Sequence, residues 1–238
     1  MPLFGDAEVA HLLEVLDARV AEYAAPPAIK DLERVVVDFT RRIQAGRLTP
    51  PQETRIASHL GRLGRKMPAA ASTFRTAQRV VREFTIGKTA PNIVGKDLEG
   101  RPLRLAEHRG KVVVVAFSGE WCGICRTEYP YERLLLELYR NWPFALLGVD
   151  SGDDASEALK SRTAQGLTFP AWWDGPGGGS APGPIAEAWL VSGWPTTYVL
   201  DGEGVIRFID VRKENLLKAV RQLLDEQLDT APATRSRR

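Results

Sequence analysis

The segment Val112–Cys125 reads VVVVAFSGEWCGIC and joins a strand pattern to a cysteine pair. Its first six residues are apolar and mostly β-branched, which is typical of a strand buried on both faces of a sheet. The cysteine pair follows directly, and we expect it to open a helix, where free N–H groups and the helix dipole favour a thiolate. The cysteines are three positions apart, which brings both sulfurs close enough to form a disulfide. This spacing predicts redox chemistry, with Cys122 as the nucleophile and Cys125 as the shielded, resolving thiol.

A zinc site is the alternative use of such a pair. It needs a second pair of ligands, and the chain has only 2 cysteines and 3 histidines, the latter scattered at His11, His59 and His108. We therefore expect no metal and no other cofactor. With only two cysteines, a disulfide framework is also excluded.

The sequence beyond the cysteine pair predicts a mixed sheet with helices on both faces. A second buried strand is expected at 144–149 and a hairpin at 196–209, around Asp201–Gly204. Helices are expected through 134–139, at 154–165 and at 214–228, and a third extended segment is expected to start within 167–172. The Gly- and Pro-rich residues 175–184 are expected to form a flexible loop that holds neither helix nor ladder.

The first 85 residues follow a different pattern, with apolar side chains at helical spacing in four runs. Proline pairs or single prolines separate the runs. The chain is thus predicted to hold a small all-α bundle at 1–85, an α/β domain at 86–228 and a disordered tail at 229–238.

Charge is balanced over the whole chain but not along the bundle. The 32 basic and 30 acidic residues give a net charge of +2, which argues against a nucleic-acid binder. No apolar run approaches the roughly 18–20 residues that span a bilayer. Residues 1–40 are net acidic and residues 41–82 are net basic. The two halves either pack beside each other or present a basic face to an anionic partner.

The α/β part resembles the thioredoxin superfamily, and within it the thiol-disulfide oxidoreductases of the TlpA/ResA type, which border on the AhpC/TSA redoxins. The resemblance covers about residues 86–228. It is carried by WCGICRTEYP at 121–130, GWPTTYVLD at 193–201, and the lead-in segments GKTAPN at 87–92, DLEG at 97–100 and RGK at 109–111. It implies a thioredoxin-like mixed sheet flanked by helices.

The resemblance also implies roles for four residues beside the cysteines. Pro195 is expected to be a cis-proline facing the disulfide, presenting the backbone of Trp194 to a substrate peptide. Trp121 and Trp194 are expected to flank the site and bind substrate. Glu128 lies three residues after Cys125 and matches the active-site glutamate of the TlpA/ResA type. There a half-buried carboxyl group is expected to exchange a proton with Cys125.

These features predict a thiol-disulfide oxidoreductase that acts on protein disulfides and is reduced again by an upstream electron donor. Reductase character is expected because Gly-Ile between the cysteines supplies no imidazolium and Glu120 adds negative charge beside Cys122. The second hypothesis is an AhpC/TSA-type peroxidase. It is less well supported, because peroxidase chemistry needs a Thr or Ser three residues before the reactive cysteine, and Gly119 occupies that position here. The third is a redox sensor whose helical bundle binds a protein partner.

The compartment depends on where the natural chain begins. The first twenty residues carry Asp6, Glu8, Glu14 and Asp17 and contain no signal-peptide core. A native start at Met1 predicts a cytoplasmic protein. The family resemblance implies a periplasmic or membrane-anchored one if the sequence is a truncated piece.

Overall fold

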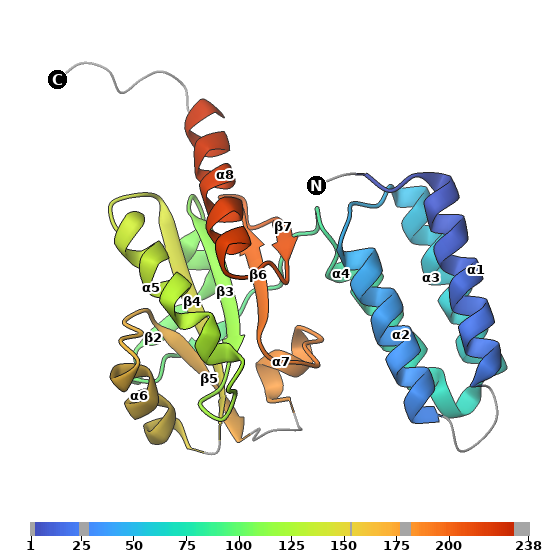
Figure 1. The fold of residues 1–238 in the computed structure, drawn as a ribbon, viewed down its shortest axis with the longest axis horizontal. Helices are drawn as coiled ribbons and strands as arrows, with labels where there is room; N and C mark the ends of the chain where they lie inside the picture. The colour runs from blue at the N-terminus through green and yellow to red at the C-terminus, as the bar shows by residue number, and fades with distance from the viewer. Residues whose placement is uncertain (1–2, 24–28, 153, 177–181, 231–238) are drawn as a thin grey trace. The chain divides into compact units, whose positions relative to one another are not determined.

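The computed structural model describes residues 3–23, 29–152, 154–176 and 182–230. The chain divides into two compact units, Met1–Lys88 and Thr89–Arg238 (Figure 1). No helix within these described ranges is long and apolar enough to cross a membrane.

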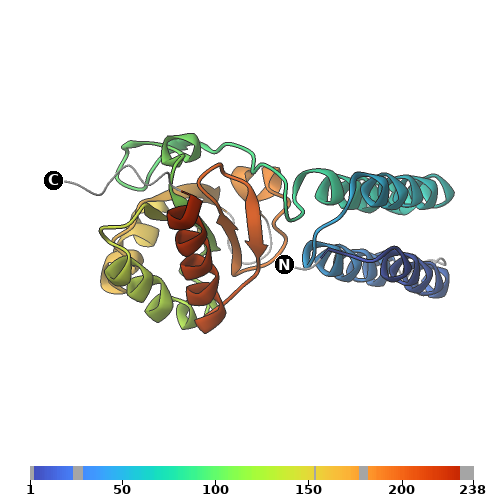
Figure 2. The same ribbon diagram turned by 90° about the horizontal axis from the view of Figure 1, so that it is seen from above.

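The first unit is the predicted helical bundle. It contains α1 (Asp6–Glu22), α2 (Ile29–Gln44), α3 (Pro50–Lys66), the short 3-10 turn η1 (Pro68–Ala70) and α4 (Ala71–Glu83). Helices α1 and α2 form one layer and α3 and α4 the other (Figure 2). The predicted helical runs are therefore confirmed.

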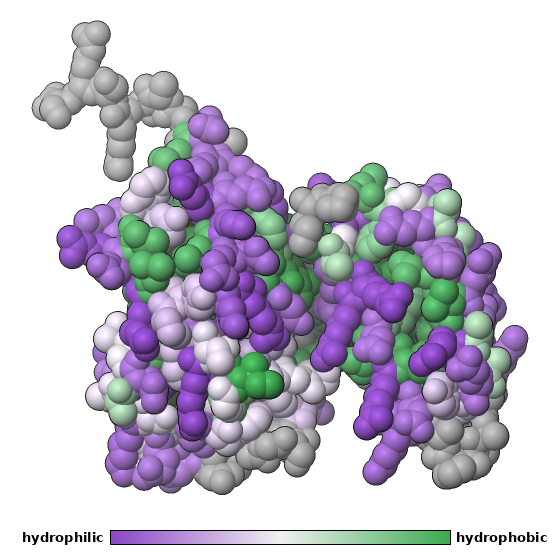
Figure 3. Space-filling view, viewed as in Figure 1, coloured by the Kyte–Doolittle hydropathy of each residue, from purple (hydrophilic) through white to green (hydrophobic). Residues whose placement is uncertain are grey.

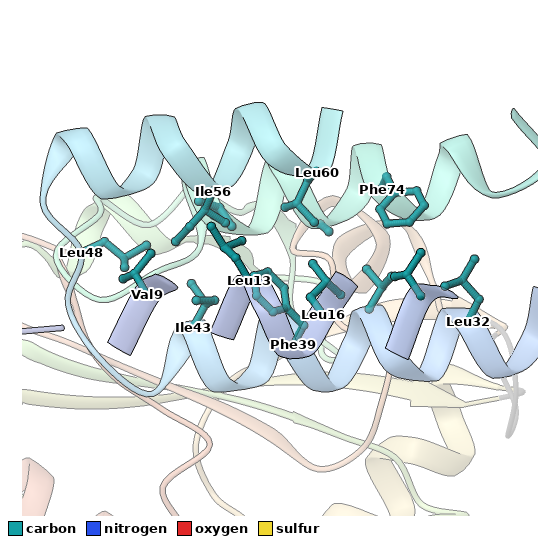
Figure 4. Close-up of a cluster of buried hydrophobic side chains, with 14 of the residues drawn as sticks. Val9, Leu13, Leu16, Leu32, Phe39, Ile43, Leu48, Ile56, Leu60 and Phe74 are labelled. Atoms are coloured by element: carbon teal, nitrogen blue, oxygen red, sulfur yellow. The ribbon is translucent and has the colours of Figure 1, made fainter. Parts of the chain in front are cut away.

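Apolar side chains from all four helices meet between these layers (Figure 4). Leu16, Phe39, Leu60 and Phe74 are each at most 5% exposed. The start of α3 is fixed locally, because Thr49 and Gln52 form a reciprocal capping box ahead of the first helical turn. Helix-terminal hydrogen bonds thus set the helix bounds, and apolar burial holds the layers together.

The second unit is built on a five-stranded sheet in the order β5-β4-β3-β6-β7. Its strands are β3 (Val112–Ser118), β4 (Phe144–Gly152), β5 (Ala171–Pro176), β6 (Thr196–Leu200) and β7 (Ile206–Ile209). β3, β4 and β5 run parallel, whereas β6 is antiparallel to β3 and β7 to β6. The predicted mixed sheet is confirmed, with β3 at its centre and buried along its whole length.

Helices flank this sheet, as predicted. On one face, α5 (Tyr129–Leu138) and α8 (Glu214–Thr230) lie side by side (Figure 1). Their apolar side chains, including Leu135, Val220 and Leu224, join one cluster with both cysteines. The remaining helices are α6 (Ala155–Ala164), which contacts β4, and α7 (Pro184–Ala188), which contacts β5.

Several local features differ from the sequence-based expectations. The third extended segment does start within 167–172, as expected, but β5 begins only at Ala171, near the end of that window. Residues 175–184 were expected to hold neither helix nor ladder, but Gly175 and Pro176 finish β5 and Pro184 begins α7; residues 177–181 lie outside the described part. The predicted tail is also too long by two residues, because α8 runs to Thr230, and 231–238 is not described.

A short antiparallel hairpin was not expected at all. It pairs β1 (Val94–Lys96) with β2 (Pro102–Arg104), and the 3-10 turn η2 (Leu105–His108) follows it. β1 is exposed along its length, so it carries no alternation of apolar and polar residues that would reveal a strand.

Candidate active site

The site begins where β3 ends. Gly119 follows Ser118, and a Cβ atom at this position would overlap the carbonyl oxygen of Ser151 and the Trp121 indole. Glycine therefore lets the chain leave the sheet beside β4 and turn at once. The Cys122 amide donates a hydrogen bond back to the Gly119 carbonyl over 3.0 Å, which closes this turn.

Cys122 and Cys125 form a disulfide with their Cα atoms 5.3 Å apart. Cys122 is 5% exposed and Cys125 1%, so Cys125 is the more shielded of the two, as expected. The Cys125 amide nitrogen lies 3.1 Å from Cys122 Sγ and donates to it. A donor aimed at this sulfur favours its ionised form after reduction.

The expectation that the cysteine pair opens a regular α-helix is wrong in detail. Cys122 lies in a turn, the 3-10 turn η3 spans Cys125–Thr127, and α5 starts only at Tyr129. The reason is Pro130, which has no N–H to donate to the carbonyl four residues earlier and is tolerated only in a first helical turn.

An apolar rim surrounds the disulfide. The rings of Trp121 and Trp194 meet edge to face with centroids 5.5 Å apart. The Trp121 indole N–H donates to the Ser151 carbonyl over 3.0 Å, whereas the buried Trp194 Nε1 has no acceptor among the described residues. Ile124, between the cysteines, is 66% exposed. The sequence shows that Ile124 lies between the two cysteines, but only the structure shows that its side chain is exposed.

The loop before β6 carries the predicted cis-proline, since the Trp194–Pro195 peptide bond is cis. Arg212 donates a hydrogen bond through Nη2 to the Pro195 carbonyl. The Thr196 hydroxyl donates to the Gly193 carbonyl over 2.8 Å. These bonds hold the loop on both sides of Pro195, and no sequence pattern pointed to the contribution of Arg212.

Glu128 lies between η3 and α5 and is only 4% exposed, which is more buried than expected. Its Oε2 accepts a 2.9 Å hydrogen bond from the Lys213 amide just before α8. Its own amide donates to the Cys125 carbonyl over 2.9 Å. Glu128 thus follows the disulfide closely in the chain, and its carboxylate is tied to the segment that leads into α8.

Glu120 lies on the approach to the motif. Its Oε2 is buried without a hydrogen-bond partner in the described part of the chain. The carboxylate packs so closely on Gly152 that a Cβ atom there would overlap it. The Glu120 side chain is therefore held against Gly152 at the end of β4, and its effect on Cys122 stays a prediction.

A buried polar cluster behind the site was missed by sequence reasoning. Arg162 Nη1 donates to Asp150 Oδ2 over 2.6 Å, and both side chains are at most 6% exposed. Burial raises the pKa of Asp150, and Arg162 counteracts that rise. Glu132, also buried, has its pKa raised to about 8, chiefly by burial. Glu132 could have been noticed in the sequence, because it is a charged residue on the otherwise apolar face of α5.

A mixed five-stranded sheet, a disulfide at the end of its central strand and a cis-proline loop define the class of thioredoxin-fold thiol-disulfide oxidoreductases. A model of the AhpC/TSA family matches residues 86–209, which is more than half of the chain. The chain belongs to that family.

Relatives within this family share the redox unit. The chain is 36% identical to the thiol-disulfide oxidoreductase ResA of Geobacillus thermodenitrificans over 124 residues, which is 52% of this chain and 68% of the relative. With ResA of Bacillus subtilis it shares 28% over 120 residues, which is 50% of this chain and 64% of that one. The chain is accordingly a ResA-like thiol-disulfide oxidoreductase.

A solved structure supports the fold. The thioredoxin domain of a thiol-disulfide oxidoreductase from Bacteroides vulgatus superposes with a TM-score of 0.53 at 24% identity. The match covers 60% of this chain and 99% of that one.

Proposed function

We propose that Cys122 and Cys125 are the redox-active pair that reduces disulfides of protein substrates. The Cys122 thiolate attacks one substrate sulfur, forming a mixed disulfide and releasing the other sulfur as a thiolate. The Cys125 thiolate then attacks Cys122 Sγ, which frees the second substrate thiol and leaves the enzyme as the disulfide. Two electrons pass to the substrate, and an upstream dithiol donor restores them. The hydrogen bond from the Cys125 amide to Cys122 Sγ carries this assignment.

Glu128 exchanges a proton with Cys125 in this proposal. Cys125 must lose a proton to resolve the mixed disulfide and regain one when the disulfide is reduced. Glu128 is the carboxyl group that follows Cys125 directly in the η3 to α5 segment and is buried with it. Its backbone partner at Lys213 holds the carboxyl group in place without neutralising it by an ion pair.

The apolar rim binds the substrate. Trp121, Trp194 and the exposed Ile124 supply apolar surface beside a buried sulfur, which suits an unfolded or extended peptide segment. The loop at Trp194–Pro195 offers backbone groups to such a segment.

Variants of the cysteines test the assignment. Cys122→Ser is expected to abolish reduction of insulin disulfides, whereas Cys125→Ser is expected to accumulate mixed disulfides through Cys122. Iodoacetamide should label Cys122 first in the reduced protein. Faster labelling of Cys125, or trapping by Cys122→Ser instead, would reverse the two roles.

We propose further that residues 1–85 form a separate domain that binds an acidic protein partner. Besides Arg79, six exposed basic residues lie on the layer formed by α3 and α4, namely Arg55, Arg62, Arg65, Lys66, Arg75 and Arg82. The acidic residues of these two helices are Glu53, which pairs with Lys88, and Glu83, which pairs with Arg79. The layer therefore presents excess positive charge.

The opposite layer is less suited to this role. Its surface carries an apolar groove between α1 and α2 lined by Leu12, Val15 and Val35 with mixed charges at the rim, part of the green area over the bundle in Figure 3. Mixed charges do not select a partner of one sign, whereas the basic layer does.

Charge reversal tests the basic layer. We expect nuclease-treated full-length protein to retain acidic proteins at low salt and to lose them in the triple variant Arg55→Glu, Arg75→Glu, Arg82→Glu. A matched reversal of exposed Lys96, Arg104 and Arg140 in the other unit is the control. Equal retention by both triple variants would contradict the proposal, as would loss of all retention after nuclease treatment.

A further inference from the structure

Three titratable side chains lie along one buried face of the segment that follows the disulfide. They are Cys125, Glu128 and Glu132, each at most 5% exposed. Spacings of three and four residues place such side chains one above the other. The backbone links them in the same order, because the Glu128 amide donates to the Cys125 carbonyl and the Glu132 amide to the Glu128 carbonyl, over 2.9 and 3.1 Å. Glu132 thus lies one helical turn beyond Glu128, on the side away from the disulfide.

Glu132 shares its surroundings with one buried ion pair. Asp150 on β4 and Arg162 on α6 interact with it electrostatically, and the charged or titratable groups near it on its own segment are Glu128, Tyr129 and Arg133. The Arg162 guanidinium is already engaged, since Nη1 donates to Asp150 Oδ2 and Nη2 to the Phe169 carbonyl, both over 2.6 Å. Two buried carboxyl groups therefore compete for one cation, and hydrogen bonding assigns that cation to Asp150.

This competition decides the charge of Glu132. Burial raises its pKa to about 8; Asp150 and Glu128 add to the rise, and Arg162 and Arg133 oppose it. Glu132 is then mostly a neutral acid at pH 7 and becomes a carboxylate in mildly alkaline solution. Because like charges disfavour each other, its ionisation raises the free energy of negative charge on Glu128 and on Cys125.

We propose that Glu132 is a positioning residue for the redox reaction, which acts through Glu128 by staying neutral while Cys125 ionises to resolve the mixed disulfide. The proposal rests on the proposed roles of the cysteines and of Glu128. Glu132 touches neither substrate nor sulfur in this scheme and transfers no proton. The ionisation state of Glu132 sets the amount of negative charge near Cys125, and therefore the pH range in which the Cys125 thiolate forms and attacks the mixed disulfide.

The resolving step can be measured on the full chain. A chromogenic aryl disulfide reacts with reduced protein in two phases: attack by Cys122 releases one aryl thiol, and attack by Cys125 on the mixed disulfide releases the second. The rate of the second phase follows the Cys125 thiolate. In the wild-type protein we expect its pH profile to bend near pH 8, where Glu132 ionises.

Glu132→Gln is the decisive variant, because glutamine resembles the neutral acid in shape. We expect its second phase to match the wild type below about pH 7 and to be faster above about pH 8.5, on the order of two- to fivefold, because its pH profile then reflects the Cys125 thiol without ionisation of residue 132. Glu137→Gln, an exposed glutamate on the same helix, serves as the control and should follow the wild type throughout. Coincidence of Glu132→Gln with the wild type at every pH would overturn the proposal.

A second measurement does not depend on the folding of a variant. Coupling between two sites is reciprocal, so reduction of the disulfide must shift the titration midpoint of the Glu132 carboxyl carbon in NMR spectra of the wild-type protein. Equal midpoints in the oxidised and reduced forms would overturn the proposal. Failure of the proposed function looks different, because the second phase would then persist in Cys125→Ser.

Discussion

The amide of Lys213 donates a hydrogen bond to Glu128 Oε2 over 2.9 Å, although 85 positions separate the two residues in the chain. The bond joins the segment after the cysteines to the start of α8. It holds the buried Glu128 carboxyl group by means of a backbone donor, which every substitution of Lys213 except proline leaves in place. A glutamine at position 128 can still accept this bond through its amide oxygen, so the chemistry of Glu128 can be separated from its structural role.

The first prediction uses that separation. Glu128→Gln is expected to lower kcat/KM for insulin reduction by about tenfold or more near neutral pH, because general acid–base groups commonly contribute 10²–10⁴-fold, roughly. The thermal midpoint should change little, since the Lys213 bond survives. Parallel assays of Glu137→Gln give the baseline. An unchanged rate and pH profile in Glu128→Gln would exclude the proton-exchange role.

The second prediction concerns the reduction potential. Glu120 lies two residues before Cys122 and has a buried, unpartnered carboxylate oxygen, and negative charge on it would disfavour the reduced thiolate relative to the disulfide. We expect a potential below roughly −200 mV, nearer to thioredoxin at about −270 mV than to strong oxidants at about −120 mV. Glu120→Gln should raise it by about 10–30 mV. Equilibration with glutathione or dithiothreitol buffers measures both proteins, and a wild-type value near the strong oxidants would favour a disulfide donor instead.

The third prediction concerns the buried ion pair. Arg162→Met leaves Asp150 buried beside Glu132 without its cation, and loss of one partner of such a pair costs about 3–5 kcal/mol. Urea unfolding at pH 7 should show this loss. The double variant Asp150→Asn, Arg162→Met is expected to regain part of it, because no uncompensated charge remains. If the single and double variants unfold alike, the pair is not what stabilises this region.

The fourth prediction is the pH dependence of stability. The pKa of Glu132 is about 8 in the folded chain, against 4.5 as its ordinary value. Its stabilising contribution is therefore complete below about pH 4.5 and is lost as the pH rises through 8, since the unfolded chain releases that proton earlier. The loss is on the order of 3–5 kcal/mol. Free energies of unfolding should fall across this window in the wild type and much less in Glu132→Gln.

The fifth prediction tests whether the two units are independent. Leu60 is fully buried in the bundle, and Leu60→Ala should cost about 2–5 kcal/mol of bundle stability. Under conditions in which the bundle still folds, the rate of insulin reduction should stay unchanged. Leu3→Ala, at a side chain that is 57% exposed, is the matched control. A fall in the reduction rate that accompanies the loss of Leu60 would show that the units act together.

Local sequence patterns were enough to predict the central strand, the cysteine loop and the helices of the bundle. The apolar, β-branched run at Val112–Phe117 buries its side chains on both faces when it forms a central strand of a sheet. The spacing of the cysteines allows one short loop to carry both sulfurs. Helical spacing of apolar residues likewise gave the bundle its helices. Three-residue strands such as β1 escaped notice because they bury too little apolar surface to leave a pattern.

Tertiary structure alone decided which distant groups meet. The sheet order places β4 and β6 on either side of β3, so Ser151, from one neighbour, and Trp194, just before the other, both reach Trp121. Likewise α7 begins where the Asp174 carboxylate accepts the amides of Ile185 and Ala186. The charge of Glu132 depends on burial against Asp150 and Arg162, which lie on β4 and α6. Such contacts arise because the chain crosses between distant elements and because the folded core removes side chains from water. The local spacing of apolar residues in the sequence predicts neither effect.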